Sequence, residues 1–421
     1  MSPQPGRGVF TQFGACLNFG ATQKTDTCKG RDGTVRGFRA IPQFLRKEAT
    51  KSYLDAPGRP GYLLALTFPS VPLPRLDFTA QDRLMVLAPH PDDESLACGG
   101  LIMRAAQAGA AVRVIFATNG DNNPWPQRYL ERRWRVGPEE RRRWGARRRA
   151  EALRAIQTLG LPAQSACFLE FPDQGFTDAL LRADRQITDV FAREIREWRP
   201  TLLVLPSPND THRDHNAIAV LYDLLLRRLA ADHQPTVIHY PVHPCDQQVT
   251  EADLTLSLNY EAMKQKLDAV LCHQSQMALS EKRFVAFVRP EESYLSAVWD
   301  TRRPDHHPVK LARVEKGELR LLLNVDWTWS VPRLFVATEQ LLDGQPCQVM
   351  RLRKSEGPIR VTESVTGRLL QPGTLKRVDG MLELRLPWAL PETALAYVKV
   401  DRRWSFYDWA GWVKVRPASS G

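Results

Sequence analysis

The sequence predicts an α/β protein, a Rossmann-like parallel sheet with helices on both faces, followed by a C-terminal all-β module. The first part is predicted by short apolar runs, typical of buried strands, that alternate with longer helical patterns between residues 84 and 273. Such alternation indicates a parallel sheet covered on both faces. The second part is predicted by a change of pattern after Val309, where short, often alternating runs are separated by turn residues, as in a small sandwich.

The expected strands and helices follow from the length and period of each run. Four apolar residues at 84–87 suit a buried strand, and the stretch 95–110 after it has a helical pattern. Further strands are expected at 112–118, 166–170, 201–206 and 236–240, and further helices at 138–159, 184–198, 216–230 and 260–273. In the C-terminal module we expect strands at 319–324, 332–337, 347–352, 381–386 and 394–400.

These patterns divide the chain into three parts. Residues 1–45 lack a sustained period and are rich in Gly, Thr, Gln and basic residues, which predicts a disordered segment. Residues 46–300 are expected to form the α/β domain and residues 310–421 the β domain. The linker between the domains contains His306 and His307, which we expect to be solvated. Tryptophans are frequent in the β domain, where they fill a core more often than they stack on sugar rings.

The composition limits the classes of function. With 421 residues, 43% of them hydrophobic, the chain can form two domains with a large core. Its seven cysteines are odd in number and form no Cys-x-x-Cys pair, which indicates a reducing compartment. No stretch approaches the roughly 20 apolar residues of a membrane span. We therefore expect a cytoplasmic protein, with peripheral contact at the inner membrane face left open.

The charge points to an anionic partner. A net charge of +11 favours a phosphorylated substrate, an acidic lipid surface or nucleic acid. Residues 132–154 contain ten arginines, which form either a solvated helix face or a dock for phosphate. Nucleic acid is the less well supported partner, because the chain lacks the aromatic and glycine pattern of a known binding module.

Chemistry is expected where the first strand passes into its helix. The stretch Pro89–Ser95 contains His90, Asp92 and Asp93, and ligands of open parallel sheets bind at the carboxyl ends of the strands. His90 and Asp93 could ligate a metal there, which leaves Asp92 free to act on a bound water. The alternative is that these acids only cap the helix and favour the positive end of its dipole.

A second cluster favours the metal interpretation. The stretch Thr211–Asn216 also follows an apolar run, and it contains His212, Asp214 and His215. The two histidines are three residues apart, so both can face one side of the first turn of a helix. Chance alone rarely places metal-ligating residues at the ends of two separate strands.

These motifs resemble those of the PIG-L, or LmbE-like, family of zinc-dependent de-N-acetylases. The resemblance rests on Pro89–Glu94, on His212–His215 and on two weaker stretches within 148–160 and 266–276. Arg213 departs from the family, in which proline is frequent between the two histidines. The resemblance implies a zinc-dependent deacetylase whose substrate is an N-acetylated sugar or glycolipid.

The chemistry of the residues suggests their roles, and the resemblance implies the same ones. Zn²⁺ held by three protein ligands, here His90, Asp93 and His215, keeps one position open and lowers the pKa of its water toward about 7. Asp92 can take a proton as general base. His212 can stabilise the oxyanion and pass a proton to the leaving amine, while Asp214 would orient His212.

Substrate contacts are expected from other loops at the same edge of the sheet. Asn119 and Asp121 follow the second strand. By resemblance, Arg148 and Asp173 would meet sugar hydroxyls. For each of these residues a turn or a surface contact is the alternative.

The predicted function is therefore a zinc hydrolase that removes the acetyl group from an N-acetylated amino sugar. The β module and the basic charge favour a bacterial cell-surface glycan of the lipopolysaccharide core type. Two other classes stay open: a metal-dependent amidase for another small amide, as in a thiol or antibiotic pathway, and a non-enzymatic protein that binds glycan or nucleic acid. His239 and His243, at another strand end, are expected to be structural.

Overall fold

The computed structural model describes residues 76–229, 234–243, 252–296, 298–300, 306–325, 327, 331–401, 407–408 and 410–417. The prediction for residues 1–45 lies outside this part of the chain, as do Trp329, Trp404 and Trp409. Among the described residues, no helix has the length and apolar character that crossing a membrane requires.

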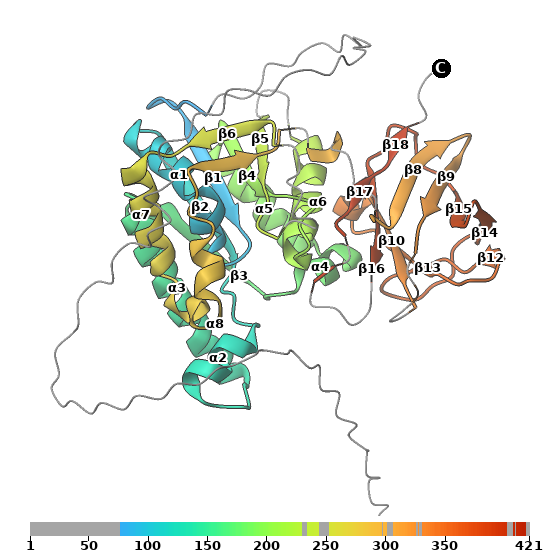
Figure 1. Cartoon of the computed structure of the whole chain (residues 1–421). Helices are drawn as coiled ribbons and strands as arrows, with labels where there is room; N and C mark the ends of the chain where they lie inside the picture. The colour runs from blue at the N-terminus through green and yellow to red at the C-terminus, as the bar shows by residue number, and fades with distance from the viewer. Residues whose placement is uncertain are drawn as a thin grey trace, which may run out of the picture. The chain divides into compact units, whose positions relative to one another are not determined.

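A five-stranded parallel sheet organises the α/β domain (Figure 1), with the strands in the order β3-β2-β1-β4-β5. The chain passes from β1 outward to β3, and β4 then pairs with the opposite edge of β1. The direction of winding therefore reverses between β1 and β4, and their carboxyl ends border a crevice suited to a ligand. The strands are β1 (Arg83–Ala88), β2 (Ala111–Thr118), β3 (Ala166–Phe171), β4 (Leu202–Pro206) and β5 (Thr236–Tyr240), close to the predicted ranges.

Helices cover both faces of this sheet, as predicted. On β1, Leu84 and Val86 contribute to the core on one face and Met85 and Leu87 to the core on the other, because successive side chains of a strand point to opposite sides. The first face packs against α1 (Asp93–Gln107), α3 (Pro138–Thr158) and α7 (Tyr260–Leu271), and the second against α4 (Phe176–Arg182), α5 (Arg185–Trp198) and α6 (Arg213–Arg227).

Five further helices and strands of the α/β domain were not predicted, and one of them is α4 on the second face of the sheet. Two are the helices α2 (Pro124–Glu131) and α8 (Gln274–Val285), which contact each other. The other two, β6 (Leu254–Ser257) and β7 (Glu291–Tyr294), form a separate antiparallel pair. Pro124 and Pro126 make the start of α2 hard to recognise from the sequence, although proline is well tolerated in a first helical turn.

The C-terminal module consists of two sheets that enclose one apolar core, which confirms the all-β prediction. Leu321 on β9 and Leu334 on β10 belong to this core, although the two strands lie in different sheets. Trp327 and Trp388 pack against this core. Trp412 and Phe335 are buried in a different core, the one that also contains side chains of α4, α5 and α6. The sheet orders are β13-β11-β10-β16-β17 and β12-β14-β15-β9-β8-β18. The strands are β8 (Val309–Glu315), β9 (Glu318–Leu323), β10 (Arg333–Thr338), β11 (Gln348–Arg351), β12 (Gly357–Ile359), β13 (Thr362–Glu363), β14 (Gly373–Val378), β15 (Met381–Pro387), β16 (Ala396–Asp401), β17 (Val413–Lys414) and β18 (Arg416–Pro417).

The described residues of the β module and of the α/β domain are parts of one compact unit. Side chains of β10 and β16, including Phe335 and Tyr397, join the apolar core formed by α4, α5 and α6. The expectation for one linker residue is wrong: His307 is buried, and its Nδ1 accepts a hydrogen bond from the backbone amide of Val309. His306 is exposed, as expected.

Candidate metal and active site

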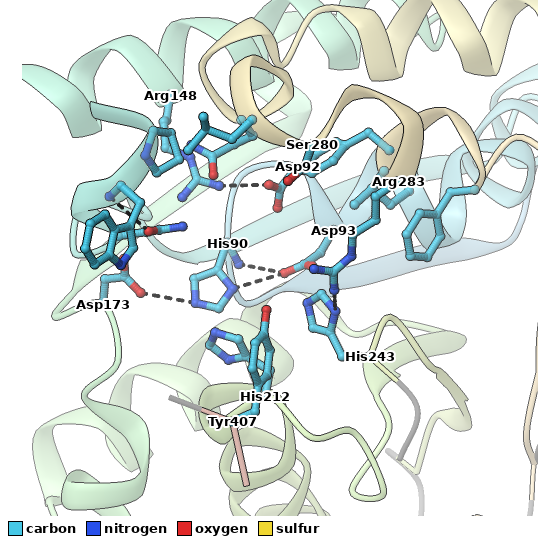
Figure 2. Close-up of a pocket in the computed structure, with 18 of the residues that line it drawn as sticks. His90, Asp92, Asp93, Arg148, Asp173, His212, His243, Ser280, Arg283 and Tyr407 are labelled. Atoms are coloured by element: carbon cyan, nitrogen blue, oxygen red, sulfur yellow. Dashed lines mark hydrogen bonds and ion pairs between the residues drawn. The ribbon is translucent and has the colours of Figure 1, made fainter. Parts of the chain in front are cut away.

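The candidate site is a cavity of about 440 Å³ that lies beside the carboxyl ends of β1 and β4 (Figure 2). His90, Asp92 and Asp93 come from the loop and first helical turn after β1, and His212 comes from the loop after β4. The two predicted clusters, more than one hundred residues apart in sequence, therefore meet in one cavity.

The backbone of the first cluster is locally strained. Asp92 has φ 146°, a region that L residues rarely adopt, and it precedes the first residue of α1. Its side chain makes no capping bond to the helix, so the alternative of a simple N-cap is wrong for this residue. The Asp93 carboxylate accepts a hydrogen bond from the His90 amide at 2.9 Å, which draws the two side chains together. Such strain is common where a backbone must present side chains for function.

Three donor atoms converge beside the cavity, from His90 and Asp93, which line it, and from the fully buried His215. His90 Nδ1 lies 3.3 Å from Asp93 Oδ2, which lies 3.2 Å from His215 Nε2, and the two histidine nitrogens are 3.4 Å apart. Zinc bonds of about 2.0–2.1 Å in a tetrahedral site separate their ligand atoms by about 3.3 Å. The predicted ligand set therefore has the spacing of three corners of a zinc tetrahedron. His212 also has a ligand atom within 4.8 Å of those of both histidines.

Carboxylates hold the far side of each of the two histidines. His90 Nε2 lies 3.2 Å from Asp173 Oδ1 and 3.2 Å from Asp214 Oδ2, and His215 Nδ1 lies 3.0 Å from Asp210 Oδ2. Histidine ligands of metals commonly contact a carboxylate through their second nitrogen, which fixes the ring and makes it a stronger donor. This arrangement fits a metal as well as the three donor atoms do.

The electrostatics of the cluster attract a cation. Burial alone would lower the pKa of His215, but the Asp93 and Asp210 carboxylates outweigh it and raise the pKa to about 10. The pKa of Asp93 lies well below its usual range, because His215 and His90 outweigh the effect of its burial. A site that holds positive charge this strongly is suited to a proton or to a divalent metal.

Asp92 lies beside this cluster and is paired with Arg148. One Arg148 nitrogen donates to Asp92 Oδ2 at 3.0 Å and to the Pro91 carbonyl at 2.7 Å, and the other donates to the Gly120 carbonyl at 2.6 Å. Burial raises the pKa of Asp92 to about 6, and Arg148 opposes that rise. Gly120 has φ +61°, and a Cβ at this position would overlap the guanidinium. Glycine is therefore required where Arg148 passes.

His212 is the N-cap of α6, and its Nδ1 accepts a hydrogen bond from the Asp214 amide at 3.3 Å. Burial, followed by the nearby His90 and His215, holds the pKa of His212 well below its ordinary value. A neutral ring whose Nδ1 accepts a bond carries its proton on Nε2. We predicted that Asp214 would orient His212, and the structure differs. The Asp214 carboxylate instead accepts hydrogen bonds from the Gln174 and Phe176 amides and contacts His90.

The family model for PIG-L, described as GlcNAc-PI de-N-acetylase, matches residues 85–225. The chain contains a PIG-L domain. Curated relatives from Mycobacterium tuberculosis and Mycobacterium bovis, named 1D-myo-inositol 2-acetamido-2-deoxy-alpha-D-glucopyranoside deacetylase, are 30% identical over 146 residues. The match covers 32% of this chain and 47% of those relatives, so the chain spans about half of their length.

Solved structures also resemble the PIG-L domain. A conserved protein of Thermus thermophilus is 24% identical with a TM-score of 0.39, covering 53% of this chain and 97% of its own. The N,N'-diacetylchitobiose deacetylase of Pyrococcus horikoshii is 17% identical with a TM-score of 0.40, covering 52% of this chain and 87% of its own.

The residues expected to bind substrate in the PIG-L domain lie at different places. Arg148 and Asp173 line the cavity, but both are also committed to protein partners, Arg148 to Asp92 and Asp173 to His90 and the Asn122 amide. Asn119 and Asp121 are not among the described residues that line the cavity. Their Cβ atoms instead lie close to Gly145 on α3. Substrate contact by these four residues stays a prediction.

Other residues of the cavity were missed or given another role. His243 was expected to be structural, yet it lines the cavity, where its Nδ1 contacts an Arg283 nitrogen. Its position just after β5, at the same edge as the ends of β1 and β4, was the available signal. Tyr407 comes from the β module and lies with its ring centroid 5.6 Å from that of His243. Asp210, which binds His215, was also missed, although it precedes the second motif by only one residue.

Proposed function

We propose that the protein is a metal-dependent hydrolase that removes the acetyl group from an N-acetylated amino sugar. The observation that carries this proposal is the triangle of His90 Nδ1, Asp93 Oδ2 and His215 Nε2, with the Asp92 carboxylate beside it. The names of the PIG-L family and of the curated relatives, all of which describe the deacetylation of an acetamido sugar, support the choice of reaction.

The three donors would hold the metal, which we propose to be zinc. When bound, zinc would supply a water of lowered pKa and a Lewis acid for the amide carbonyl. The set of two imidazoles and one carboxylate suits zinc better than it suits magnesium or calcium, which prefer oxygen ligands throughout. Asp173, Asp214 and Asp210 would keep the two histidine rings in place.

The roles of the remaining residues follow from whether each side chain can accept a proton or donate a hydrogen bond. Asp92 has a pKa of about 6 and can accept the proton of the attacking water near neutral pH. Arg148 would keep Asp92 aimed at the cavity, since it contacts this carboxylate and two backbone carbonyls of neighbouring loops. His212, with its proton on Nε2, can donate a hydrogen bond to the oxygen that becomes negative, and the proton that Asp92 accepted from the water can pass to the leaving nitrogen. Hydrolysis would consume one water, break the C–N bond and release acetate and a free amine.

The finer substrate class is also part of the proposal. The net charge of +11 and the arginines near the cavity support an anionic glycan or glycolipid, for which a bacterial cell-surface glycan of the lipopolysaccharide core type is our choice. The cysteines described as free, Cys98, Cys167, Cys272 and Cys347, suit action in the cytoplasm.

The first prediction tests the reaction with purified full-length protein. Incubation with a panel of acetamido-sugar glycans should release acetate, and the protein should carry about one zinc ion per chain by metal analysis. A strong chelator should remove both the zinc and the activity, and added zinc should restore them. Full acetate release from metal-free protein would contradict the proposal. Release from amides other than acetamido sugars would keep the site and change the substrate class.

A further inference from the structure

Beyond the cavity, helix α2 and the loop after it carry large apolar side chains on the surface. Trp125 is 58% exposed, Tyr129 61%, Leu130 38% and Trp134 74%. We call these four residues the aromatic cluster. Figure 1 shows α2 projecting from one end of the α/β domain, next to α8. Contiguous exposed aromatics of this kind mark an interaction surface, since each of them would otherwise be packed against protein.

Hydrogen bonds and cation–π contacts hold the aromatic cluster in a defined arrangement. The Asn123 side chain caps α2 by accepting from the Trp125 amide. Arg128 lies between the two tryptophans, with its guanidinium carbon 5.0 Å from the Trp125 ring centroid and 4.7 Å from that of Trp134. Its Nε also donates to the Trp134 carbonyl at 2.9 Å. Because these contacts fix the rings while leaving them exposed, the surface is already organised for a partner.

The same region carries an excess of positive charge. Residues 124–147 contain eight arginines and three glutamates, with no lysine or aspartate. Each glutamate pairs with one arginine, in the pairs Glu131 and Arg143, Glu139 and Arg142, and Glu140 and Arg133. Among the described residues, the exposed Arg132, Arg135 and Arg141 have no acidic partner within ion-pair distance. Arg132 and Arg135, which lie within two residues of Trp134 in the sequence, therefore leave positive charge beside the aromatic cluster that can meet an anionic surface.

We propose that the aromatic cluster and its arginines dock the protein on an anionic lipid membrane. Tryptophan and tyrosine prefer the interface between lipid and water, where the ring is buried and its polar edge stays wet. Arginines beside them gain from the negative potential of acidic headgroups. A nucleic acid would use the arginines but would leave Tyr129 and Leu130 without a role, and a second copy of this chain would bring like charges together.

The docking surface continues into the cavity. Trp125 and Pro126 of α2 line the cavity, and so does Leu279 of α8, which is 49% exposed. Docking would therefore bring the cavity mouth to the level of the headgroups. This consequence rests on the proposed function, because it implies that the amino sugar is presented by a lipid. Membrane binding itself rests only on the surface and can be tested without catalysis.

The experiment, the second prediction, measures sedimentation of full-length, chelator-treated protein with lipid vesicles. The vesicles are phosphatidylcholine alone or phosphatidylcholine mixed with phosphatidylglycerol. Wild-type protein should bind the anionic vesicles at least about tenfold more tightly, and added salt should weaken this binding. The double variant Tyr129→Ser and Trp134→Ser should lose about tenfold or more. The triple variant Arg132→Gln, Arg135→Gln and Arg141→Gln should lose about a hundredfold, since each arginine contributes several-fold.

A control variant changes exposed residues of the β module, namely one large apolar residue and two arginines. The combination of Leu369→Ser with Arg351→Gln and Arg360→Gln removes one large apolar side chain and two arginines there, and it should leave vesicle binding unchanged. Acetate release from a soluble acetamido sugar should also be unchanged in the Tyr129 and Trp134 double variant, because neither residue lines the described cavity. Wild-type protein that binds anionic vesicles but releases no acetate from any acetamido sugar would count against the proposed function alone.

Four outcomes would overturn the docking proposal. One is equal binding of the wild type to both kinds of vesicle, and another is an equal loss in the control variant. The third is a concentration-dependent dimer, seen by light scattering, that the Tyr129 and Trp134 double variant abolishes, because it would assign the surface to a second copy. Tighter binding to a DNA duplex than to anionic vesicles would assign the arginines to nucleic acid instead.

Discussion

The two strand ends that form the candidate site are supported by different parts of the chain. The end of β1, with His90 and Asp93, is held from within the α/β domain, where Arg148 of α3 contacts the Pro91 carbonyl and Asp92. The end of β4, with His215, is held from the β module. One of the three proposed metal ligands, His215, therefore lies on a turn that is contacted by a module outside the matched PIG-L region.

The support of the β4 end is a buried polar network. Asp408 of the β module accepts from Asn216 of α6 at 2.8 Å and pairs with the fully buried Lys399, and its backbone amide donates to the Thr211 carbonyl at 2.8 Å. Arg213 of α6 pairs with Asp401 and Asp408. A Cβ on Gly411 would overlap the Pro208 carbonyl, so glycine permits this close approach.

This comparison gives Arg213 a physical role. Proline, which is frequent at this position in the family that the chain resembles, could not form these ion pairs, whereas arginine connects the first turn of α6 to two aspartates of the β module. The module is thus coupled to the turn that carries His212 and His215. We infer that in this chain the added module helps to support the turn that carries His212 and His215, whereas Asp92 at the first strand end is paired within the α/β domain.

The third prediction, with the largest expected effect, removes one proposed ligand from each strand end. Asp93→Ala at the β1 end and His215→Ala at the β4 end should each lose zinc together with activity, because each removes one of three ligands. Asp92→Asn should retain zinc and slow acetate release by about 100-fold to 10,000-fold, the usual effect of removing a general base. The measurements are zinc content and acetate-release rate on the same folded samples.

His212→Ala is the matched control for the β4 end. If His212 stabilises the oxyanion through its Nε2 proton, as we propose, the variant should keep its zinc and lose rate by about 100-fold to 1,000-fold. Zinc lost from the His212 variant and kept by the Asp93 variant would instead assign the metal to the three histidines, whose ligand atoms also lie within 4.8 Å of one another.

The fourth prediction separates the two supports and has a smaller expected effect. Arg148→Gln should slow acetate release while zinc stays bound, because it removes the partner that positions Asp92. Asp408→Asn should instead weaken zinc affinity by about 10-fold to 100-fold, since residues behind metal ligands have effects of this size. It should also lower the thermal unfolding temperature, because it leaves Lys399 buried without its carboxylate.

A double variant tests whether the network acts through structure. Lys399→Met with Asp408→Leu replaces the buried ion pair by apolar groups of similar size, and it should recover much of the unfolding temperature lost in Asp408→Asn. Zinc affinity should stay weakened in the double variant, because Asn216 and Arg213 still lack the Asp408 carboxylate. Equal effects of Arg148→Gln and Asp408→Asn on zinc affinity would remove the distinction between the two ends.

The sequence predicted what depends on local patterns. The strands of the sheet were predictable because each is a short apolar run, and the two clusters were predictable because each follows such a run. The partner of Asp214 was not predictable, because its carboxylate reaches His90, which is 124 residues away in sequence. Tyr407 and Asp408 could not be placed either, since only the packing of the β module brings Tyr407 to the cavity and Asp408 to Asn216 of α6. Local motifs thus locate a site, and long-range packing decides which side chains complete it.

The last prediction concerns pH, because the histidines behind the two ends titrate in opposite directions. His273 lies behind the β1 end, where its Nε2 contacts Glu94 at 3.1 Å and Ser95 Oγ at 3.2 Å. Burial lowers its pKa, but Glu94 outweighs burial, so the pKa is raised above 6.5. His239 lies on β5 beside β4, and burial lowers its pKa to about 4.

These shifts predict opposite effects on stability. A raised pKa in the folded state means that His273 contributes stability below about pH 6.5, which is lost as the pH rises through the folded value. A lowered pKa means that His239 contributes stability above about pH 6.5, which is lost as the pH falls toward 4, by up to about 3 kcal/mol. Relative to wild type, His273→Gln should therefore be most destabilised in acid and His239→Gln least destabilised in acid. Thermal unfolding of chelator-treated proteins between pH 4 and 8 measures this difference, and parallel curves for the two variants would show that neither histidine distinguishes the two ends.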